Sequence, residues 1–249
     1  MKKRLLFLLF CLPAFPAFAV RPFITDDAAV VGRRLAQLET WLMFDRFGGG
    51  HWAMLAYGPH ERVEVAVGGV WGYDRLLQPK RTEIGYAAPL VEVKYLFRDY
   101  NTDKFPGVAL VGGTFLPAGR GDFAPPGPGA YSYLALTQCF GKDERVLLHG
   151  NLGVNYLRVG GKDDFAATWG LGTQIKAYKG LHLVGEVVSG DPYIAGSGLL
   201  YQTGVRYFVS DLLQLDATLG QGLAGENKVP FWAGLGARMV MTRFRKKQS

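Results

Sequence analysis

The sequence predicts an all-β protein, a single antiparallel transmembrane β-barrel of about 12 strands that follows a cleaved signal peptide. Three observations lead to this fold class. Polar and apolar residues alternate through long segments, of which 146–156 is the clearest. Such segments recur almost to the C-terminus, and the N-terminus has the features of a secretory signal. Alternation with a period of two describes a strand with one apolar and one polar face, as in a barrel with an apolar exterior and a polar interior.

The first 19 residues have the three parts of a signal peptide. Residues 2–4 are basic, residues 5–12 form an apolar run, and Ala17-Phe18-Ala19 is a small-x-small cleavage site. The apolar run is too short to span a bilayer as a helix, which needs roughly 20 residues. We therefore expect a signal peptide at 1–19, a periplasmic leader at 20–33 and an outer-membrane β-barrel at 34–249.

Composition narrows the function classes. The signal holds three of the 28 basic residues and none of the acidic ones, so its removal lowers the net charge from +7 to +4. An exported chain with dispersed basic residues is not expected to bind nucleic acid. The mature part has one cysteine, Cys139, and hence no internal disulfide, and nothing shows metal-ligand spacing. We expect neither a metal nor a cofactor.

Glycine and aromatic residues favour a membrane barrel. The chain has 34 glycines, 16 phenylalanines, 12 tyrosines and 5 tryptophans. In such barrels glycines allow sharp curvature, and aromatic residues lie at the two membrane interfaces. The competing class is a soluble β-sandwich, but its strands would be about five or six residues long.

The strands follow one another in order along the mature chain. Twelve are predicted at roughly 34–46, 51–58, 62–74, 87–97, 107–116, 130–140, 145–158, 165–178, 181–189, 199–209, 212–220 and 231–244. This spacing suits tilted strands of ~10 residues that cross a membrane. An even number of strands places both termini on the periplasmic side, and Phe244 is the terminal aromatic of the last strand.

The connections alternate between short and long. Those at 58–61, 98–106, 141–144, 179–180 and 210–211 are mostly tight, as periplasmic turns are. The longest outward connection, 117–129, is rich in proline and glycine and either folds inward as a constriction or covers the rim. We expect Gly48-Gly-Gly50 to form a hairpin turn and Asp163-Asp164 to lie in a loop.

Short motifs distributed in order along the chain carry a family resemblance. They are Arg21-Pro-Phe-Ile-Thr-Asp-Asp-Ala28, Ala36-Gln-Leu-Glu39, Glu92-Val-Lys94, His149-Gly-Asn-Leu-Gly153, Gly204-Val-Arg-Tyr207 and Leu213-Gln-Leu-Asp216. With them the chain resembles the outer-membrane β-barrel family named for the MetA pathway of phenol degradation. The resemblance implies an outer-membrane barrel with a transport role.

The polar strand faces supply the candidate lumen. A Lys or Arg that faces lipid at mid-membrane costs ~2–4 kcal/mol, so the polar side of each strand is expected to point inward. The predicted lumen-lining residues are Glu39, Glu64, Glu92, Lys94, His149, Asn151, Asn155, Gln174, Lys176, His182, Glu186, Gln202, Arg206, Gln214, Asp216 and Arg238. They either form a structural network or decide which solutes pass.

The leader is a possible plug. Arg21, Asp26 and Asp27 lie just before the first strand. We expect residues 21–28 to fold against or into the periplasmic mouth, with the two aspartates paired to lumen bases such as Arg206 or Lys176. The alternative is a disordered terminus.

The sequence favours a channel for passive passage of small molecules, aromatic or apolar ones by family resemblance. Outer-membrane lipid, the barrel-insertion machinery and a small-molecule solute are its expected partners. A closed structural barrel is one alternative. A lipid hydrolase is another, but it would need a serine and a histidine brought together from different strands, and none share a local motif. We therefore do not expect an enzyme.

Overall fold

The computed structural model of the chain describes residues 23–76, 81–190, 198–225 and 228–241. The expected signal peptide, Arg21 and Phe244 lie outside these residues. The elements are β1 (Ala36–Asp45), β2 (Gly48–His60), β3 (Val63–Leu76), β4 (Arg81–Arg98), β5 (Gly107–Phe115), β6 (Gly119–Arg120), η1 (Gly121–Phe123), β7 (Gly129–Phe140), η2 (Lys142–Glu144), β8 (Val146–Val159), β9 (Lys162–Tyr178), β10 (Leu181–Ser189), β11 (Leu199–Ser210), β12 (Leu213–Ala224) and β13 (Trp232–Met241). No helix in the described part of the chain is long and apolar enough to cross a membrane.

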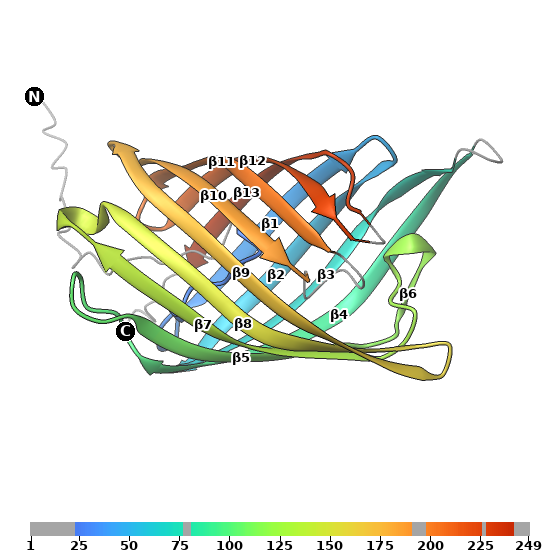
Figure 1. The fold of residues 1–249 in the computed structure, drawn as a ribbon, viewed down its shortest axis with the longest axis horizontal. Helices are drawn as coiled ribbons and strands as arrows, with labels where there is room; N and C mark the ends of the chain where they lie inside the picture. The colour runs from blue at the N-terminus through green and yellow to red at the C-terminus, as the bar shows by residue number, and fades with distance from the viewer. Residues whose placement is uncertain (1–22, 77–80, 191–197, 226–227, 242–249) are drawn as a thin grey trace, which may run out of the picture.

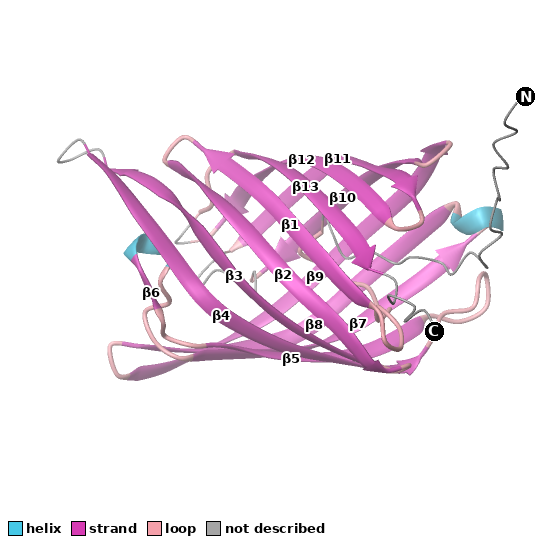
Figure 2. Cartoon of the chain, turned by 180° about the vertical axis from the view of Figure 1, so that it is seen from behind, coloured by secondary structure: helices cyan, strands magenta, loops and turns pink. Residues whose placement is uncertain are grey.

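Twelve long strands form one closed antiparallel barrel (Figures 1 and 2). Each pairs with its neighbours in chain order, and the first strand, β1, pairs with the last, β13, to close the wall. The remaining strand, β6, has only two residues. It lies within the connection between β5 and β7 and pairs with β4. The predicted fold class and strand number are confirmed. We call the end where β1 begins and β13 ends the terminal end, and the opposite end the loop end.

Two turn predictions are wrong. Gly48–Gly50 are the first residues of β2, because the chain already turns at residues 46–47, where the Asp45 carboxylate accepts bonds from the backbone N–H groups of Phe47 (2.6 Å) and Gly48 (2.9 Å).

Asp163 and Asp164 likewise lie in strand β9, not in a loop. Gly160 and Gly161 have φ of 57° and 80° and make the two-residue turn by themselves. Positive φ at both positions suits the twist of a tight hairpin, so pairing continues to its tip.

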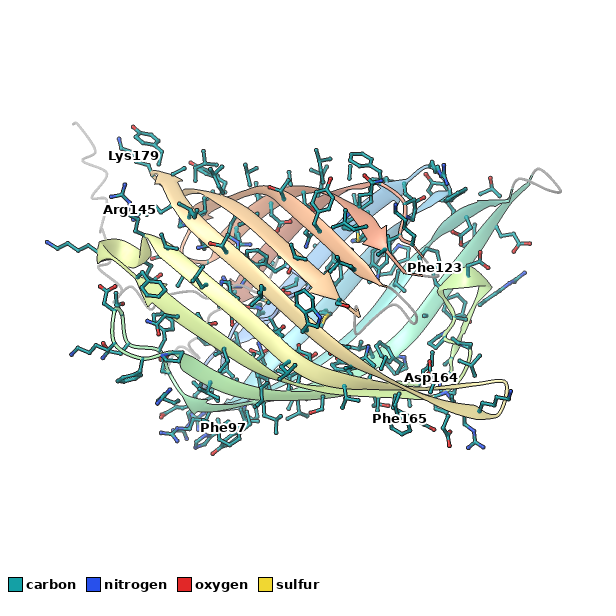
Figure 3. All side chains as sticks on the ribbon, viewed as in Figure 1. Phe97, Phe123, Arg145, Asp164, Phe165 and Lys179 are labelled. Carbon is teal, nitrogen blue, oxygen red and sulfur yellow. The ribbon has the colours of Figure 1, made fainter. Side chains whose placement is uncertain are left out.

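The two faces of the wall differ as the alternation predicts. Large apolar side chains point outward, among them Leu152 (67% exposed), Leu171 (64%) and Phe165 (69%). Figure 3 shows Phe97 and Phe165 outside the wall. Buried positions on the inner face carry polar and charged side chains, such as Glu92 and Arg238, together with apolar ones that include several alanines. An apolar exterior on a closed wall, in which the backbone groups pair between strands, meets the requirements of a bilayer.

Candidate functional site

The lumen holds the residues that precede β1. In this leader segment, residues 23–33, the side chains of Phe23, Thr25, Asp26 and Asp27 are buried, each at 5% exposure or less. A stretch with no strand or helix of its own must satisfy its backbone polar groups elsewhere. Side chains of the barrel wall satisfy them here.

Glu186 on β10 holds the start of the leader segment. Its two carboxylate oxygens accept bonds from the backbone N–H groups of Ile24 and Thr25, both at 2.7 Å. Gln202 on β11 donates to the same carboxylate from its side-chain amide. One buried wall carboxylate therefore fixes two successive leader amides.

Three further wall residues hold the rest of the segment. Asn151 on β8 accepts from the backbone N–H of Asp26 (2.6 Å) and donates to its carbonyl oxygen (2.9 Å). Thr137 on β7 accepts from the N–H of Ala28 (2.9 Å), and Glu64 on β3 accepts from that of Val31 (2.6 Å). The contacts run from β10 to β3, so the segment crosses the lumen.

Asp26 forms the charged contact of the leader segment. Its carboxylate lies 2.7 Å from the Lys94 ammonium nitrogen and accepts a bond of 3.0 Å from the Tyr133 hydroxyl. Lys94 also lies 3.9 Å from the Asp27 carboxylate. The side chains of this cluster are almost completely buried, and buried ions of opposite charge need such close partners to offset their desolvation.

The partner of Asp26 is thus Lys94, not Arg206 or Lys176 as the sequence suggested. Arg206 on β11 is the register partner of His182, and its guanidinium donates to Gln174. Lys176 is half-buried and is the register partner of His182 near the terminal end of the barrel. Which base meets Asp26 depends on the strands that the leader passes.

Phe23 occupies an aromatic subsite in the wall. Its ring centroid lies 5.4 Å from that of His149, at an interplanar angle of 55°. The Arg206 guanidinium carbon lies 5.4 Å from the same centroid, within the range of a cation–π contact. Gly172 lies beside the ring, where a Cβ would be in ordinary van der Waals contact with it at 3.4 Å.

Little space remains around the leader segment. A Cβ at Gly170 would lie 2.5 Å from the Thr25 hydroxyl oxygen. One cavity, lined by Ile24, Thr25, Tyr133, Asn151, Thr168, Trp169, Gly170, Val188 and Gly190, has about 10 Å³ of room for water. That is about the room of a single water molecule. A second cavity beside Phe23 has essentially none. The free space at these two places beside the segment is therefore small.

All the predicted lumen residues have inward positions in the strand register. Thirteen are buried: Glu39, Glu64, Glu92, Lys94, His149, Gln174, His182, Glu186, Gln202, Arg206, Gln214, Asp216 and Arg238. Three are half-buried: Asn151, Asn155 and Lys176. The structure brings six of them into contact with the leader: Glu64, Lys94, His149, Asn151, Glu186 and Arg206.

Other members of this set bond within the wall. Arg238 donates to the side-chain oxygen of Gln37 at 2.7 Å, and Gln37 donates in turn to Glu39 at 2.8 Å. The Tyr131 hydroxyl donates to Glu92 at 2.6 Å. The first of these contacts joins the neighbouring strands β13 and β1, and the Tyr131–Glu92 bond joins β7 to β4 past the intervening strand β5.

Sequence reasoning missed Tyr131, Tyr133 and Thr137, which line the lumen from β7. The two tyrosine rings are stacked with centroids 6.0 Å apart, and their hydroxyls reach inward carboxylates. None of the three was predicted to line the lumen. The odd-numbered positions of β7 were the available signal, because Thr137 and both tyrosines share them.

The connection at 116–128 turns inward and does not merely cover the rim. Phe123 lies at the loop end, opposite Arg145 and Lys179 (Figure 3). Its ring meets Trp52 edge-to-face with centroids 6.0 Å apart. Cβ atoms at Gly50, Gly72 and Gly85 would each lie 3.0 Å or less from this ring. Since these glycines have inward register positions on β2, β3 and β4, Phe123 narrows the loop-end mouth.

The hydrolase alternative needs a serine hydroxyl within hydrogen-bonding distance of a histidine ring. His149 is hydrogen-bonded through Nδ1 to Thr137 (3.0 Å). The Ser132 hydroxyl donates to the backbone carbonyl of Val111, and Ser210 accepts from backbone amides in its own turn. The described residues contain no group of three or more His, Cys, Asp or Glu side chains placed to hold a metal ion.

Comparison with known proteins identifies the family. A family model described as "Putative MetA-pathway of phenol degradation" matches residues 29–238. The chain belongs to this family. No curated protein matches the chain.

Solved structures share the fold at low sequence identity. An outer membrane channel from Pseudomonas putida F1 is similar with a TM-score of 0.65 and 11% identity, over 86% of this chain and 98% of that one. The KdgM porin in complex with disordered oligogalacturonate gives 0.58 and 8%, over 83% and 99%. The NanC porin gives 0.52 and 8%, over 84% and 100%. With its closed wall and apolar exterior, the family member described here is an outer-membrane β-barrel.

Proposed function

We propose that this barrel is a channel for small molecules and that the leader segment is its gate. The observation that carries the proposal is the way the leader is held in the lumen. Five of its backbone N–H groups donate hydrogen bonds to polar side chains from four strands of the wall. A plug held by hydrogen bonds and one ion-pair cluster can leave without unfolding the barrel. The names of the similar structures, an outer membrane channel and two porins, agree with this function.

The proposed path runs along the lumen past two barriers. The leader blocks the middle, and Phe123 narrows the loop end. We place the terminal end in the periplasm and the loop end outside, with residues 1–19 removed as a signal peptide. Aromatic or otherwise apolar small molecules are the proposed solutes, and outer-membrane lipid and the barrel-insertion machinery are the proposed partners.

Single-channel conductance in a planar bilayer tests the gate. The full mature chain is compared with a variant that lacks residues 21–28 and with the control Asp163→Asn, a change on the exposed hairpin. The deletion is expected to produce discrete conductance steps larger than those of the other two proteins. Heat-modifiable gel migration verifies that each barrel is folded.

The filled lumen also favours a second candidate, a closed structural barrel. Wall networks such as Arg238–Gln37–Glu39 would then serve stability alone. Folded but silent full-length and deleted proteins would support this alternative and refute the channel.

A further inference from the structure

We propose that the centre of the lumen is a binding site for an aromatic carboxylate, and that the leader fills this site with its own Phe23 ring and Asp26 carboxylate. The inference deepens the proposed function and rests on it, because it names the class of solute for which the gate opens. It follows from two subsites built by buried wall residues.

The first subsite accepts an aromatic ring. His149 offers a tilted ring at 5.4 Å, Arg206 offers a cation at 5.4 Å, and Gly172 lies against the ring. Both His149 (5% exposed) and Arg206 (2%) are buried wall residues. A planar ring satisfies such a site better than an aliphatic chain, since only a π-face attracts the guanidinium.

The second subsite accepts a carboxylate. The Lys94 ammonium lies 2.7 Å from one Asp26 oxygen and the Tyr133 hydroxyl lies 3.0 Å from the other. Lys94 is 1% exposed and Tyr133 is 5% exposed. Removal of the Asp26 carboxylate leaves a buried cation short of its closest partner, which is unfavourable. A carboxylate that arrives from solution restores the same charge balance.

The separation of the two subsites limits the ligand. Phe23 and Asp26 are three residues apart, so their Cα atoms are at most ~10 Å apart in a fully extended chain. The ligand therefore has a ring and a carboxylate joined by a flexible linker of several atoms. A phenylalkanoate has this form.

Binding of such a solute would open the gate. Solute and leader occupy the same two subsites, so each excludes the other. A ligand shifts a conformational equilibrium by its difference in affinity for the two states, and this ligand binds only when the leader is out. The solute would thus release the plug that blocks its own path.

Chemical labelling of the leader tests the inference. Thr25, which is 2% exposed, is changed to Cys in the full chain, and Cys139→Ala removes the native thiol. The rate of maleimide labelling then reports how often the leader leaves the lumen. We expect 6-phenylhexanoate to raise this rate saturably, whereas 6-phenylhexan-1-ol, without a charge, and hexanoate, without a ring, have at least tenfold weaker effects.

Two further variants keep the test specific. Asp26→Asn removes the competing carboxylate and should lower the half-maximal concentration of 6-phenylhexanoate by about tenfold. Adding Lys94→Gln to this variant removes the ammonium that would pair with the incoming acid and should abolish the preference of acid over alcohol. Equal effects of the three compounds, or a preference that survives Lys94→Gln, would overturn the inference. Conductance of the 21–28 deletion is scored separately, so failure of the solute class is distinguishable from failure of the gate.

Discussion

Replacement of Lys94 by methionine should release the leader segment. Lys94 is the closest cation to Asp26, at 2.7 Å, and also lies 3.9 Å from Asp27. Loss of one partner from a buried ion pair costs about 3–5 kcal/mol, because the remaining charge is left desolvated. The barrel can avoid this cost by expelling the leader, which carries both aspartates into water.

The expected size of the effect follows from that cost. A free-energy change of 1.4 kcal/mol alters an equilibrium tenfold, so the population with the leader released should rise by roughly 10²- to 4 × 10³-fold. Maleimide labelling of Thr25→Cys follows this population when the leader exchanges faster than it reacts. In the Cys139→Ala background, the labelling rate should increase by the same factor.

The matched control is Lys176→Met. Lys176 is also an inward lysine, but it is half-buried and lies near the terminal end of the wall. Its replacement should change the labelling rate by less than about threefold, since no buried charge loses its partner. Equal rates for Lys94→Met and the parent protein, with both barrels folded by gel migration, would refute the role assigned to the ion pair.

Two further predictions concern the wall and its turns. Leu171 is 64% exposed on the outer face of β9, so Leu171→Arg should lower the free energy of unfolding in lipid vesicles by ~2–4 kcal/mol. The control Leu171→Val should have a much smaller effect. Equal losses for the two variants would contradict a lipid-facing position. The Tyr100 hydroxyl donates to Glu144 at 2.5 Å between two turns, and burial, helped by this carboxylate, raises the pKa of Tyr100. A raised pKa means that its stabilising contribution is complete below pH about 10, the ordinary value, and declines at higher pH. Tyr100→Phe should therefore unfold more easily at pH 8 yet lose less stability than the parent protein between pH 9 and 11, and parallel pH profiles would argue against this bond.

The strands could be predicted from the sequence because the bilayer enforces a local rule. A strand such as β8 must present apolar residues to lipid and polar ones to the lumen, so its neighbours in sequence reveal its faces. The positions of the two wrongly predicted turns depend instead on the conformation and contacts of a few residues at the end of each strand. At residues 46–47 a side-chain cap from Asp45 ends the strand, and this contact overrides the preference of glycine for turns.

The partners inside the lumen could be predicted only in part. Asp26 and Lys94 are 68 residues apart in the chain, and their contact depends on which strands face one another across the closed barrel. That arrangement follows from strand order, tilt and register together, which a single sequence does not reveal. Tyr133 was missed for another reason: its ring belongs to an apolar pattern, but its hydroxyl serves a charged site.

The pairing of β1 with β13 also dictates an order of assembly. Ala36 meets Met241 across the seam, so the wall is complete only after the last strand has been inserted. The leader's bonding partners come from β3, β4, β7, β8 and β10. These side chains surround the leader only when opposite sides of the wall face each other, so the first strands alone do not form its binding site. Entry of the leader is therefore a late step of folding, and a protected leader marks a barrel that has finished closing.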